Sequence, residues 1–339
     1  MIPHNSPACG AEEAEAASRV IQSGWLAQGK EVAAFEDALC EFLGLPAGHA
    51  VAVSSGTAAL FLALWVLGAK GKPVGLPVYA CSALRNAIAM AGGEEILLDT
   101  GKGTPNIDLA QATSSKAEII IAPHMFGIPM DLSEAGDKQL IEDCAQSLGA
   151  KVGGRRTGLQ GKVGIYSFYA TKMMTSGGQG GMLVSHDKSL VDAVRDYREF
   201  DCRHDRHRRF NFQMTDMQAA VGRVQLKRLP GFIERRAAIF KIYQEAGLNL
   251  LDAPVNAAGF EPVRYRAVIR TYRQGEILTA LAENGVRAIV PIEDWELLGD
   301  GADYPHAWDM TKTTVSLPVF PALTDEQAVN IAACVKGLA

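Results

Sequence analysis

The sequence lacks the hydrophobic stretch that a membrane-spanning helix requires. Its longest apolar run is "AALFLALWVLGA" at 58–69, whereas crossing a bilayer takes about 20 mainly apolar residues. The first residues, "MIPHNSPACGAEEAEAASRV", also lack the basic start and apolar core of a signal peptide. We therefore expect a buried helix at 58–69 and a cytoplasmic protein that makes no contact with a membrane.

The sequence also lacks an excess of positive charge, which would indicate a polyanionic partner. It lacks closely spaced cysteines as well, which would indicate a metal site. The 33 Lys and Arg residues are balanced by 38 Asp and Glu residues, so the net charge is −5 at pH 7 and gives no general attraction for nucleic acid. The six cysteines form no CxxC pair, and we expect reduced thiols without a disulfide framework or a zinc site. They are Cys9, Cys40, Cys81, Cys144, Cys202 and Cys334.

Short apolar runs alternate with helical patterns through most of the chain. Apolar spacing predicts helices at 11–23, 31–43 and 215–244, the last bent or broken at Pro230. Strand-like runs are "AVAVSS", "EEILLD", "AEIIIAPHM", "KQLIEDCA", "KVGIYSFY" and "GGMLVS". This alternation predicts an α/β protein with a largely parallel sheet between helices. After about residue 245 the pattern becomes that of a smaller α+β lobe.

Three strand ends carry residues that could bind a ligand, since ligands lie at the carboxyl ends of parallel strands. In "AVAVSSGTAALFLAL" a strand is followed by Ser55, Gly56 and Thr57 at the start of a helix. Free N–H groups and hydroxyls at a helix N-terminus bind phosphate. The alternative is an ordinary helix-capping turn, and for this motif alone it is the preferred interpretation.

The second strand end, in "KQLIEDCAQSLGA", places Asp143 after a buried run, with Gln146 three residues further on. Asp143 could hold a protonated ring nitrogen by a charge-assisted hydrogen bond. A solvated loop carboxylate is the simpler interpretation of an isolated acid.

The third, in "GIYSFYATKMMTSGGQGG", places Ser167 and Lys172 between a strand and a glycine cluster. A lysine in an apolar site can form a Schiff base with a carbonyl, although most lysines are on the surface. A phosphate site, an acid for a ring nitrogen and an imine-forming lysine are together the three requirements of pyridoxal 5′-phosphate (PLP). The combination is far more specific than any one of them.

The sequence also resembles the DegT/DnrJ/EryC1/StrS family of sugar aminotransferases over nearly its whole length. The resemblance lies in "VIQSGWLAQGKEVAAFEDALCEFLG", "AVSSGTAAL", "IEDCAQSLGA", "YSFYATK", "NFQMTDMQAAVGRVQLKRL" and "VSLPVFPALTDEQAVNIAACV", in the expected order. It implies the fold-type I architecture of PLP-dependent transferases. We expect a large PLP-binding domain at 1–236 with a mostly parallel seven-stranded sheet, and a small C-terminal α+β domain at 237–339.

The same resemblance implies roles for individual residues. Lys172 would be the Schiff-base lysine and general base, and Asp143 the partner of the pyridine nitrogen. Gln146 would lie at the hydroxyl side of the ring. Contacts to the phosphate would come from Gly56, Thr57 and Ser167, with Ser55 beside them. Asn211 would reach the phosphate in the neighbouring subunit, so we expect a homodimer with shared active sites.

The basic segment "REFDCRHDRHRRFN" at 198–211 has three interpretations. The first is a mobile, solvated loop, and the second is an arm that crosses the dimer toward an anionic cofactor or substrate. A nucleic-acid patch ranks last, because the rest of the chain is acidic. The loop and the arm are compatible with each other.

The sequence departs from the family pattern at the cofactor ring. Cys81 takes the place of the aromatic that usually stacks on the ring, and Tyr79 lies two residues earlier. Either could face the ring, because alternate residues of an extended segment share a side, and we favour Cys81. Gln179 replaces the glutamate of the family's "GEGG" motif.

The family's sugar-pocket motif "HY.PLH" is absent, and "VPIEDWELLGDGADYPHAW" stands in its place. Its Glu293, Asp294, Trp295 and His306 either line a different pocket or cap a loop, and the second is favoured for each of them.

We predict an aminotransferase that passes an amino group from L-glutamate or L-glutamine, through the amino form of the cofactor (PMP), to a keto-sugar, nucleotide-linked keto-sugar or keto-cyclitol. A dehydratase or lyase on the same scaffold is the first alternative, but family dehydratases carry histidine where this chain has Lys172. A non-catalytic PLP-binding regulator is the second, and no helix-turn-helix pattern supports it. The identity of the acceptor stays open.

Overall fold

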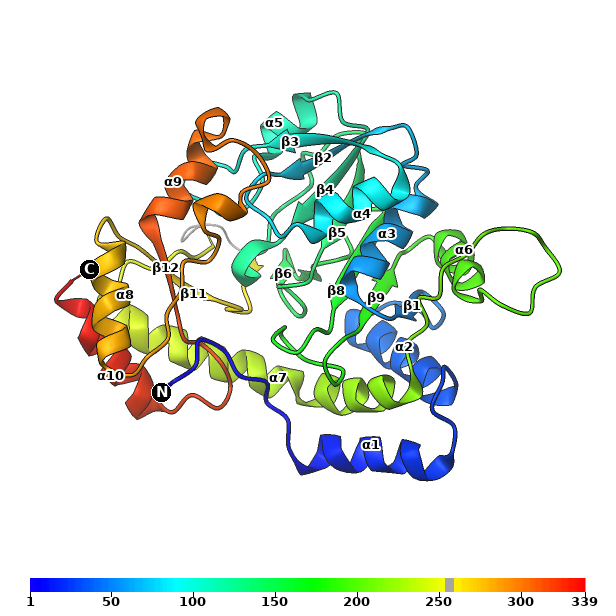
Figure 1. Cartoon of the computed structure of the whole chain (residues 1–339), viewed down its shortest axis with the longest axis horizontal. Coiled ribbons are helices and arrows are strands. Elements are labelled where there is room, and N and C mark those ends of the chain that lie inside the picture. Colours follow the sequence, from blue (N-terminus) through cyan, green and yellow to red (C-terminus); the bar gives the residue numbers. More distant parts are fainter. Residues whose placement is uncertain (254–258, 339) are drawn as a thin grey trace.

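A seven-stranded sheet forms the centre of the molecule (Figure 1). The computed structural model describes residues 1–253 and 259–338, and the strand order is β1-β9-β8-β5-β4-β2-β3. β9 runs antiparallel to both of its neighbours, whereas the other strands of this sheet run parallel to one another. The sheet is therefore mostly parallel, as predicted. Its strands are β1 Ala50–Val53, β2 Pro73–Pro77, β3 Glu94–Leu98, β4 Ile119–Pro123, β5 Gln139–Asp143, β8 Val163–Ser167 and β9 Gly181–Val184.

Helices cover both faces of this sheet because its strands are apolar on both sides. Val51 and Val53 pack in the same core as α3, α4 and α6, while Ala50 and Ala52 pack with α2 and α7 on the opposite face. The helices are α1 Ala11–Ser23, α2 Lys30–Leu43, α3 Gly56–Val66, α4 Ala83–Ala91, α5 Leu109–Ser114, α6 Lys188–Arg198, α7 Asp216–Glu245, α8 Gln274–Glu283, α9 Pro305–Thr313 and α10 Asp325–Lys336, with short 3-10 helices at Met125–Gly127, Asp294–Glu296 and Gly301–Asp303.

α3 is the buried helix expected from the longest apolar run. Every residue from Ala58 to Leu64 is buried, because the sheet lies on one side of the helix and α4 and α6 pack on the others. Among the helices in the described part of the chain, none combines the length and the apolar character needed to cross a membrane.

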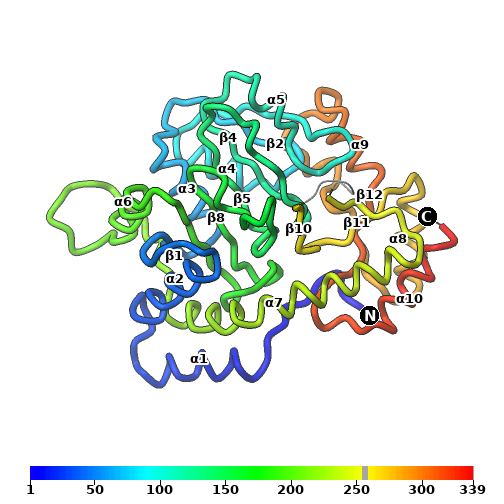
Figure 2. The backbone as a smooth tube through the Cα atoms, turned by 180° about the vertical axis from the view of Figure 1, so that it is seen from behind, coloured from blue at the N-terminus to red at the C-terminus, as the bar shows by residue number. Residues whose placement is uncertain are grey.

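α7 joins the sheet to the C-terminal part of the chain (Figure 2). It begins at the cap of Thr215, whose hydroxyl accepts the N–H of Gln218 while the Gln218 side chain accepts the N–H of Thr215. The helix continues through Pro230 without interruption, so the predicted alternative of a break at that residue is wrong. The proposed domain boundary at 236/237 lies within this helix.

The C-terminal part contains strands and helices around a core of its own. β11 Ala267–Arg270 pairs antiparallel with β12 Thr314–Leu317, and α8, α10 and the end of α7 pack against this pair. The N-terminus joins it, because Ile2 forms a bridge with Val286. A small separate sheet has the order β10-β6-β7, with β10 Phe260–Glu261, β6 Lys151–Val152 and β7 Arg155–Arg156.

Candidate active site

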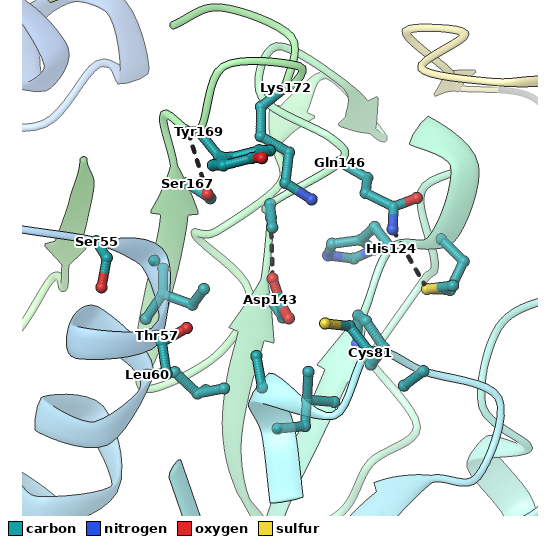
Figure 3. Close-up of a pocket in the computed structure, with 18 of the residues that line it drawn as sticks. Ser55, Thr57, Leu60, Cys81, His124, Asp143, Gln146, Ser167, Tyr169 and Lys172 are labelled. Atoms are coloured by element: carbon teal, nitrogen blue, oxygen red, sulfur yellow. Dashed lines mark hydrogen bonds between the residues drawn. The ribbon is translucent and has the colours of Figure 1, made fainter. Parts of the chain in front are cut away.

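The carboxyl ends of the parallel strands surround a cavity of about 340 Å³, which we call the inner cavity (Figure 3). The start of α3 lines one side of it, and the residues that end or follow β2, β4, β5 and β8 line the others. All the residues predicted for the site except Asn211 are on its walls: Ser55, Gly56, Thr57, Cys81, Asp143, Gln146, Ser167 and Lys172.

The Lys172 amine and the Asp143 carboxylate point into the same space (Figure 3). Asp143 is 7% exposed, and its Oδ1 accepts the Ala145 N–H at 2.9 Å. Within the described residues Oδ2 has no hydrogen-bond donor. Burial raises the pKa of Asp143, and the Ala145 N–H, Lys172 and His124 oppose that rise only in part. A cation placed against Oδ2 would stabilise the charged form.

The loop that carries Lys172 is held from two sides. The Lys172 N–H donates to the Tyr169 carbonyl at 3.0 Å, and the Asn5 side-chain amide donates to the Thr171 carbonyl at 2.9 Å. Lys172 Nζ lies 5.5 Å from the centre of the Tyr265 ring. The backbone of the loop is thus held in part by the N-terminal segment, and the Lys172 amine lies near a residue of the C-terminal part.

The start of α3 and the end of β8 lie in close contact because Gly56 has no side chain. A Cβ at Gly56 would be 2.7 Å from Ser167 Cβ, and one at Gly181 would be 2.2 Å from the Ser55 carbonyl oxygen. Part of the predicted glycine cluster is therefore needed for packing.

Ser55 caps α3, accepting the Ala58 N–H at 3.1 Å, so the simpler interpretation of this motif, a helix-capping turn, holds as well. The N–H groups of Gly56 and the next residue have no acceptor within the helix and are available to an anion.

Gln146 is held by a strained turn. Its Oε1 accepts the Phe126 N–H at 2.8 Å, and Phe126 has a φ of 61°, a conformation that costs a non-glycine residue about 1–3 kcal/mol. Nε2 donates to the Met125 sulfur at 3.9 Å (Figure 3), and the amide has a second N–H that can donate at the cavity. A contact between Gln146 and a ring hydroxyl stays a prediction.

His124 is a cavity residue that the sequence analysis missed. It is fully buried directly after β4. Its Nδ1 accepts the Met130 N–H at 3.0 Å, so its Nε2 carries the proton and donates to Glu142 at 3.0 Å. The rule of polar residues at strand ends, which selected Asp143, would also have selected His124.

Glu142, His124 and Cys144 lie close enough together to be considered as metal ligands. Each is already engaged: Glu142 accepts the backbone N–H groups of residues 158, 160 and 161 besides His124. Burial raises the pKa of the Cys144 thiol, which keeps it protonated. We interpret the cluster as a hydrogen-bond network that supports the cavity wall.

The structure distinguishes Cys81 from Tyr79. Cys81 is exposed and lines the inner cavity. Tyr79 is fully buried, and its ring packs edge-on against Phe126 with the ring centres 6.2 Å apart. Of the two, Cys81 lies at the cavity surface and Tyr79 is covered, and the contact of Cys81 with a cofactor ring stays a prediction.

A second cavity of about 470 Å³, the outer cavity, adjoins the first and shares five lining residues with it: Ala80, Cys81, Met125, Gln146 and Lys172. Its other lining residues are Ser82, Phe126, Tyr265, Arg266, Pro291, Ile292, Trp295 and Glu296. Tyr265 and Arg266 had no signal in the sequence, because they come from a distant part of the chain.

In the segment that replaces the family's sugar-pocket motif, one of the four residues singled out in the sequence lines a cavity, and the other three make contacts within the chain. Trp295 lines the outer cavity and is 77% exposed. Asp294 forms an ion pair with Lys312, Glu293 takes part in the capping box of a 3-10 helix, and the backbone N–H of His306 donates to Asp99 at 3.0 Å.

The basic segment 198–211 contains a loop that projects from the molecule after α6 (Figures 1 and 2). Three of its arginines form ion pairs within the chain: Arg198 with Glu36, and Arg203 and Arg209 with Asp196 and Asp205. This pairing weakens the nucleic-acid interpretation. Asn211 is exposed and does not line the inner cavity.

The sequence model of the DegT/DnrJ/EryC1/StrS aminotransferase family matches residues 7–336, and the chain belongs to this family. GDP-perosamine synthase of Vibrio cholerae is 29% identical over 371 residues, covering 99% of this chain and 98% of the relative. The dTDP-3-amino-3,4,6-trideoxy-alpha-D-glucose transaminase of Streptomyces venezuelae is 30% identical over 353 residues, covering 96% and 92%. The solved aminotransferase TlmJ from Streptoalloteichus hindustanus has a TM-score of 0.91 at 28% identity, covering 99% and 98%.

The chain is therefore a fold-type I aminotransferase that uses PLP. The inner cavity fits this cofactor chemically. It offers an amine for the aldehyde, a buried carboxylate with one unengaged oxygen for the ring nitrogen, and a helix start for the phosphate.

Proposed function

We propose that the enzyme transfers an amino group from L-glutamate or L-glutamine to a ketone on a sugar, a nucleotide-linked sugar or a cyclitol. The observation that carries this proposal is that Lys172 and Asp143 point into one cavity (Figure 3), in a chain whose relatives are named for the synthesis or transamination of amino sugars.

Lys172 and Asp143 divide the proton chemistry. When bound, PLP draws into its ring the electrons released at the amino-bearing carbon. Lys172 would hold the cofactor through Nζ, and the same amine would move the proton at the amino-bearing carbon. Asp143 would keep the ring nitrogen protonated, because a cation placed against Oδ2 would offset the cost of the buried carboxylate charge.

The remaining cavity residues orient the cofactor. The N–H groups of Gly56 and Thr57, with the hydroxyls of Ser55 and Ser167, would bind the phosphate. Gln146 Nε2 would donate to the oxygen on the ring. Cys81, which borders both cavities, would lie beside the ring.

We also propose that the enzyme is a homodimer in which Asn211 contacts the phosphate in the partner's site. Support comes from the exposed position of Asn211 and from the bond between the Phe212 carbonyl and the Ser54 N–H, at 2.8 Å, which anchors this segment next to the end of β1.

A mixed dimer tests this arrangement. Lys172→Ala and Asn211→Ala chains would be co-expressed with different tags and the mixed species purified. If Asn211 acts across the dimer, one site of each mixed dimer has both native residues, so about half of the native activity per dimer returns. If Asn211 acts within its own chain, neither site is restored and activity stays as low as in the single variants.

A cytoplasmic location is the last part of the proposal. All six cysteines lie in the described part of the chain, and none is in a disulfide, as in a reducing compartment. Cell fractionation would check it.

A half-reaction screen tests the function. The enzyme would be loaded with PMP and mixed with keto-sugars, both free and nucleotide-linked, and with keto-cyclitols. We expect the aldehyde-form spectrum to return with at least one member of these classes. Return only with simple 2-oxo acids would contradict the proposed acceptor.

A further inference from the structure

Arg266 is a cation in the wall of the outer cavity that has no acidic partner in the described residues. Its neighbours along the chain are paired: Arg264 with Asp252 and Arg270 with Asp309. Among the residues that the structure describes, its side chain makes two long polar contacts, from Nη1 to His4 Nε2 at 3.4 Å and to Ser316 Oγ at 3.5 Å. A half-buried guanidinium in this state retains most of its capacity to bind an anion.

Both polar neighbours of Arg266 are uncharged at working pH. Burial and then the Arg266 charge lower the pKa of His4 from 6.5 to about 3, and Ser316 is a hydroxyl. The acid that lines the outer cavity, Glu296, has its Oε2 engaged with the Glu293 N–H at 2.9 Å. No ion pair joins Glu296 to Arg266 among the residues the structure describes.

Arg266 also lies near the reacting amine. Its Cζ is 5.6 Å from the centre of the Tyr265 ring, and Lys172 Nζ is 5.5 Å from the same centre. Burial acts to raise the pKa of Tyr265, but the charges of Lys172, Arg266 and Arg236 more than offset it, and the pKa is lowered. One aromatic ring therefore lies in the field of both cations, next to a cavity that both of them line.

We propose that Arg266 binds a carboxylate of the amino acid donor in the outer cavity and so directs the donor's amino-bearing carbon toward Lys172. Guanidinium and carboxylate match in shape and charge, and they form paired hydrogen bonds. The inference rests on the proposed function and deepens it, because it makes Arg266 a specificity residue for the donor half-reaction.

The test compares Arg266→Gln and Arg266→Lys with Arg270→Gln, which loses a structural ion pair outside both cavities. Conversion of the holoenzyme to its amino form would be followed by single-turnover absorbance against L-glutamate concentration. We expect the apparent Kd to rise about 10–100-fold in Arg266→Gln, less in Arg266→Lys, and less than threefold in Arg270→Gln. The limiting rate should stay within a few-fold of the native rate.

The same measurement with L-glutamine, which has an amide in place of the side-chain carboxylate, shows which carboxylate Arg266 binds. An equal loss for glutamine and glutamate assigns Arg266 to the α-carboxylate, and a loss for glutamate alone assigns it to the side-chain carboxylate. An unchanged donor affinity in Arg266→Gln overturns the proposal, as does a loss of equal size in Arg270→Gln. Loss of uridine diphosphate binding without loss of donor affinity would also overturn it, by assigning the cation to a nucleotide.

Calorimetry with glutarate separates this inference from the proposed function. Glutarate has two carboxylates and no amino group, so its binding requires no transamination. Binding that disappears in Arg266→Gln supports the anion site even if no amino acid converts the native enzyme, which would refute the proposed function alone. Equal binding to the native and Arg266→Gln enzymes contradicts the carboxylate site.

Discussion

Replacing Glu142 by Gln exchanges one carboxylate oxygen for an NH2 group where four donors converge. Oε2 accepts His124 Nε2–H at 3.0 Å and the Gly158 N–H at 2.8 Å, and Oε1 accepts the Gly161 N–H at 2.7 Å and the Gln160 N–H at 2.5 Å. Either orientation of the amide therefore leaves two donors facing another donor. His124 cannot relieve this by moving its proton, because Nδ1 already accepts the Met130 N–H.

The expected loss follows from that geometry. Each buried donor without an acceptor costs about 1–3 kcal/mol, and relief of the buried charge returns part of this. We therefore expect Glu142→Gln to lower the free energy of unfolding by about 2–5 kcal/mol.

The loss should also depend on pH. Burial, the largest influence, raises the pKa of Glu142, but the hydrogen bonds and charge of His124 and the backbone N–H groups lower it below its usual value. A lowered carboxyl pKa stabilises the fold above the unfolded pKa of about 4.3, and this contribution disappears as the pH falls through the folded pKa. The difference between native and variant protein should thus be full at pH 7 and shrink below about pH 4.3.

Urea unfolding at pH 7 and at a pH below about 4.3, followed by tryptophan fluorescence, measures the difference in the free energy of unfolding between the native and variant proteins. Glu94→Gln is the matched control, since Glu94 is exposed at the start of β3, and it should change stability by less than about 0.5 kcal/mol. Equal stabilities for Glu142→Gln and Glu94→Gln at pH 7 would refute the reasoning.

Three further outcomes are expected. Asp143→Asn keeps an acceptor for the Ala145 N–H but loses the negative charge. The donor half-reaction, measured by stopped flow, should therefore slow by about 10²–10³-fold. A native rate in this variant would remove Asp143 from the site. Gly56→Ala puts a Cβ 2.7 Å from Ser167 Cβ, so it should lower the free energy of unfolding by about 1–3 kcal/mol. It should also weaken PLP binding, measured by titration. Unchanged PLP affinity would argue against a phosphate site at the start of α3. The His4 pKa falls from 6.5 to about 3 on folding, so the free energy of unfolding should decline below about pH 6.5, by about 2 kcal/mol at pH 5. In thermal melts His4→Gln should flatten this decline. An unaltered pH profile in the variant would contradict the prediction.

Apolar runs were enough to predict most of the central sheet, because its strands are buried on both faces. β2 escaped the pattern because Pro73, Gly75 and Pro77 resemble turn residues. In the structure the prolines stand at the strand ends. A Cβ at Gly75 would be only 3.0 Å from Leu98 Cδ1, so glycine permits close packing there. The reversed direction of β9 was likewise not predictable from its own residues.

The inner cavity was largely predictable, whereas the outer cavity was not. Asp143 and Lys172 follow strand-like runs, and strand ends converge wherever a parallel sheet forms. Tyr265, Arg266 and Trp295 reach the site only because the C-terminal part packs against the sheet, and no local pattern encodes that packing. The distinction between Cys81 and Tyr79 also required the fold, because it depends on which side chain is covered.

Reductive trapping tests the central claim most directly. The PLP-loaded enzyme would be treated with borohydride, digested and analysed by mass spectrometry. The account predicts a pyridoxyl group on the peptide that contains Lys172, and no labelling in Lys172→Ala. A pyridoxyl group on a different lysine, or native labelling of the variant, would contradict it.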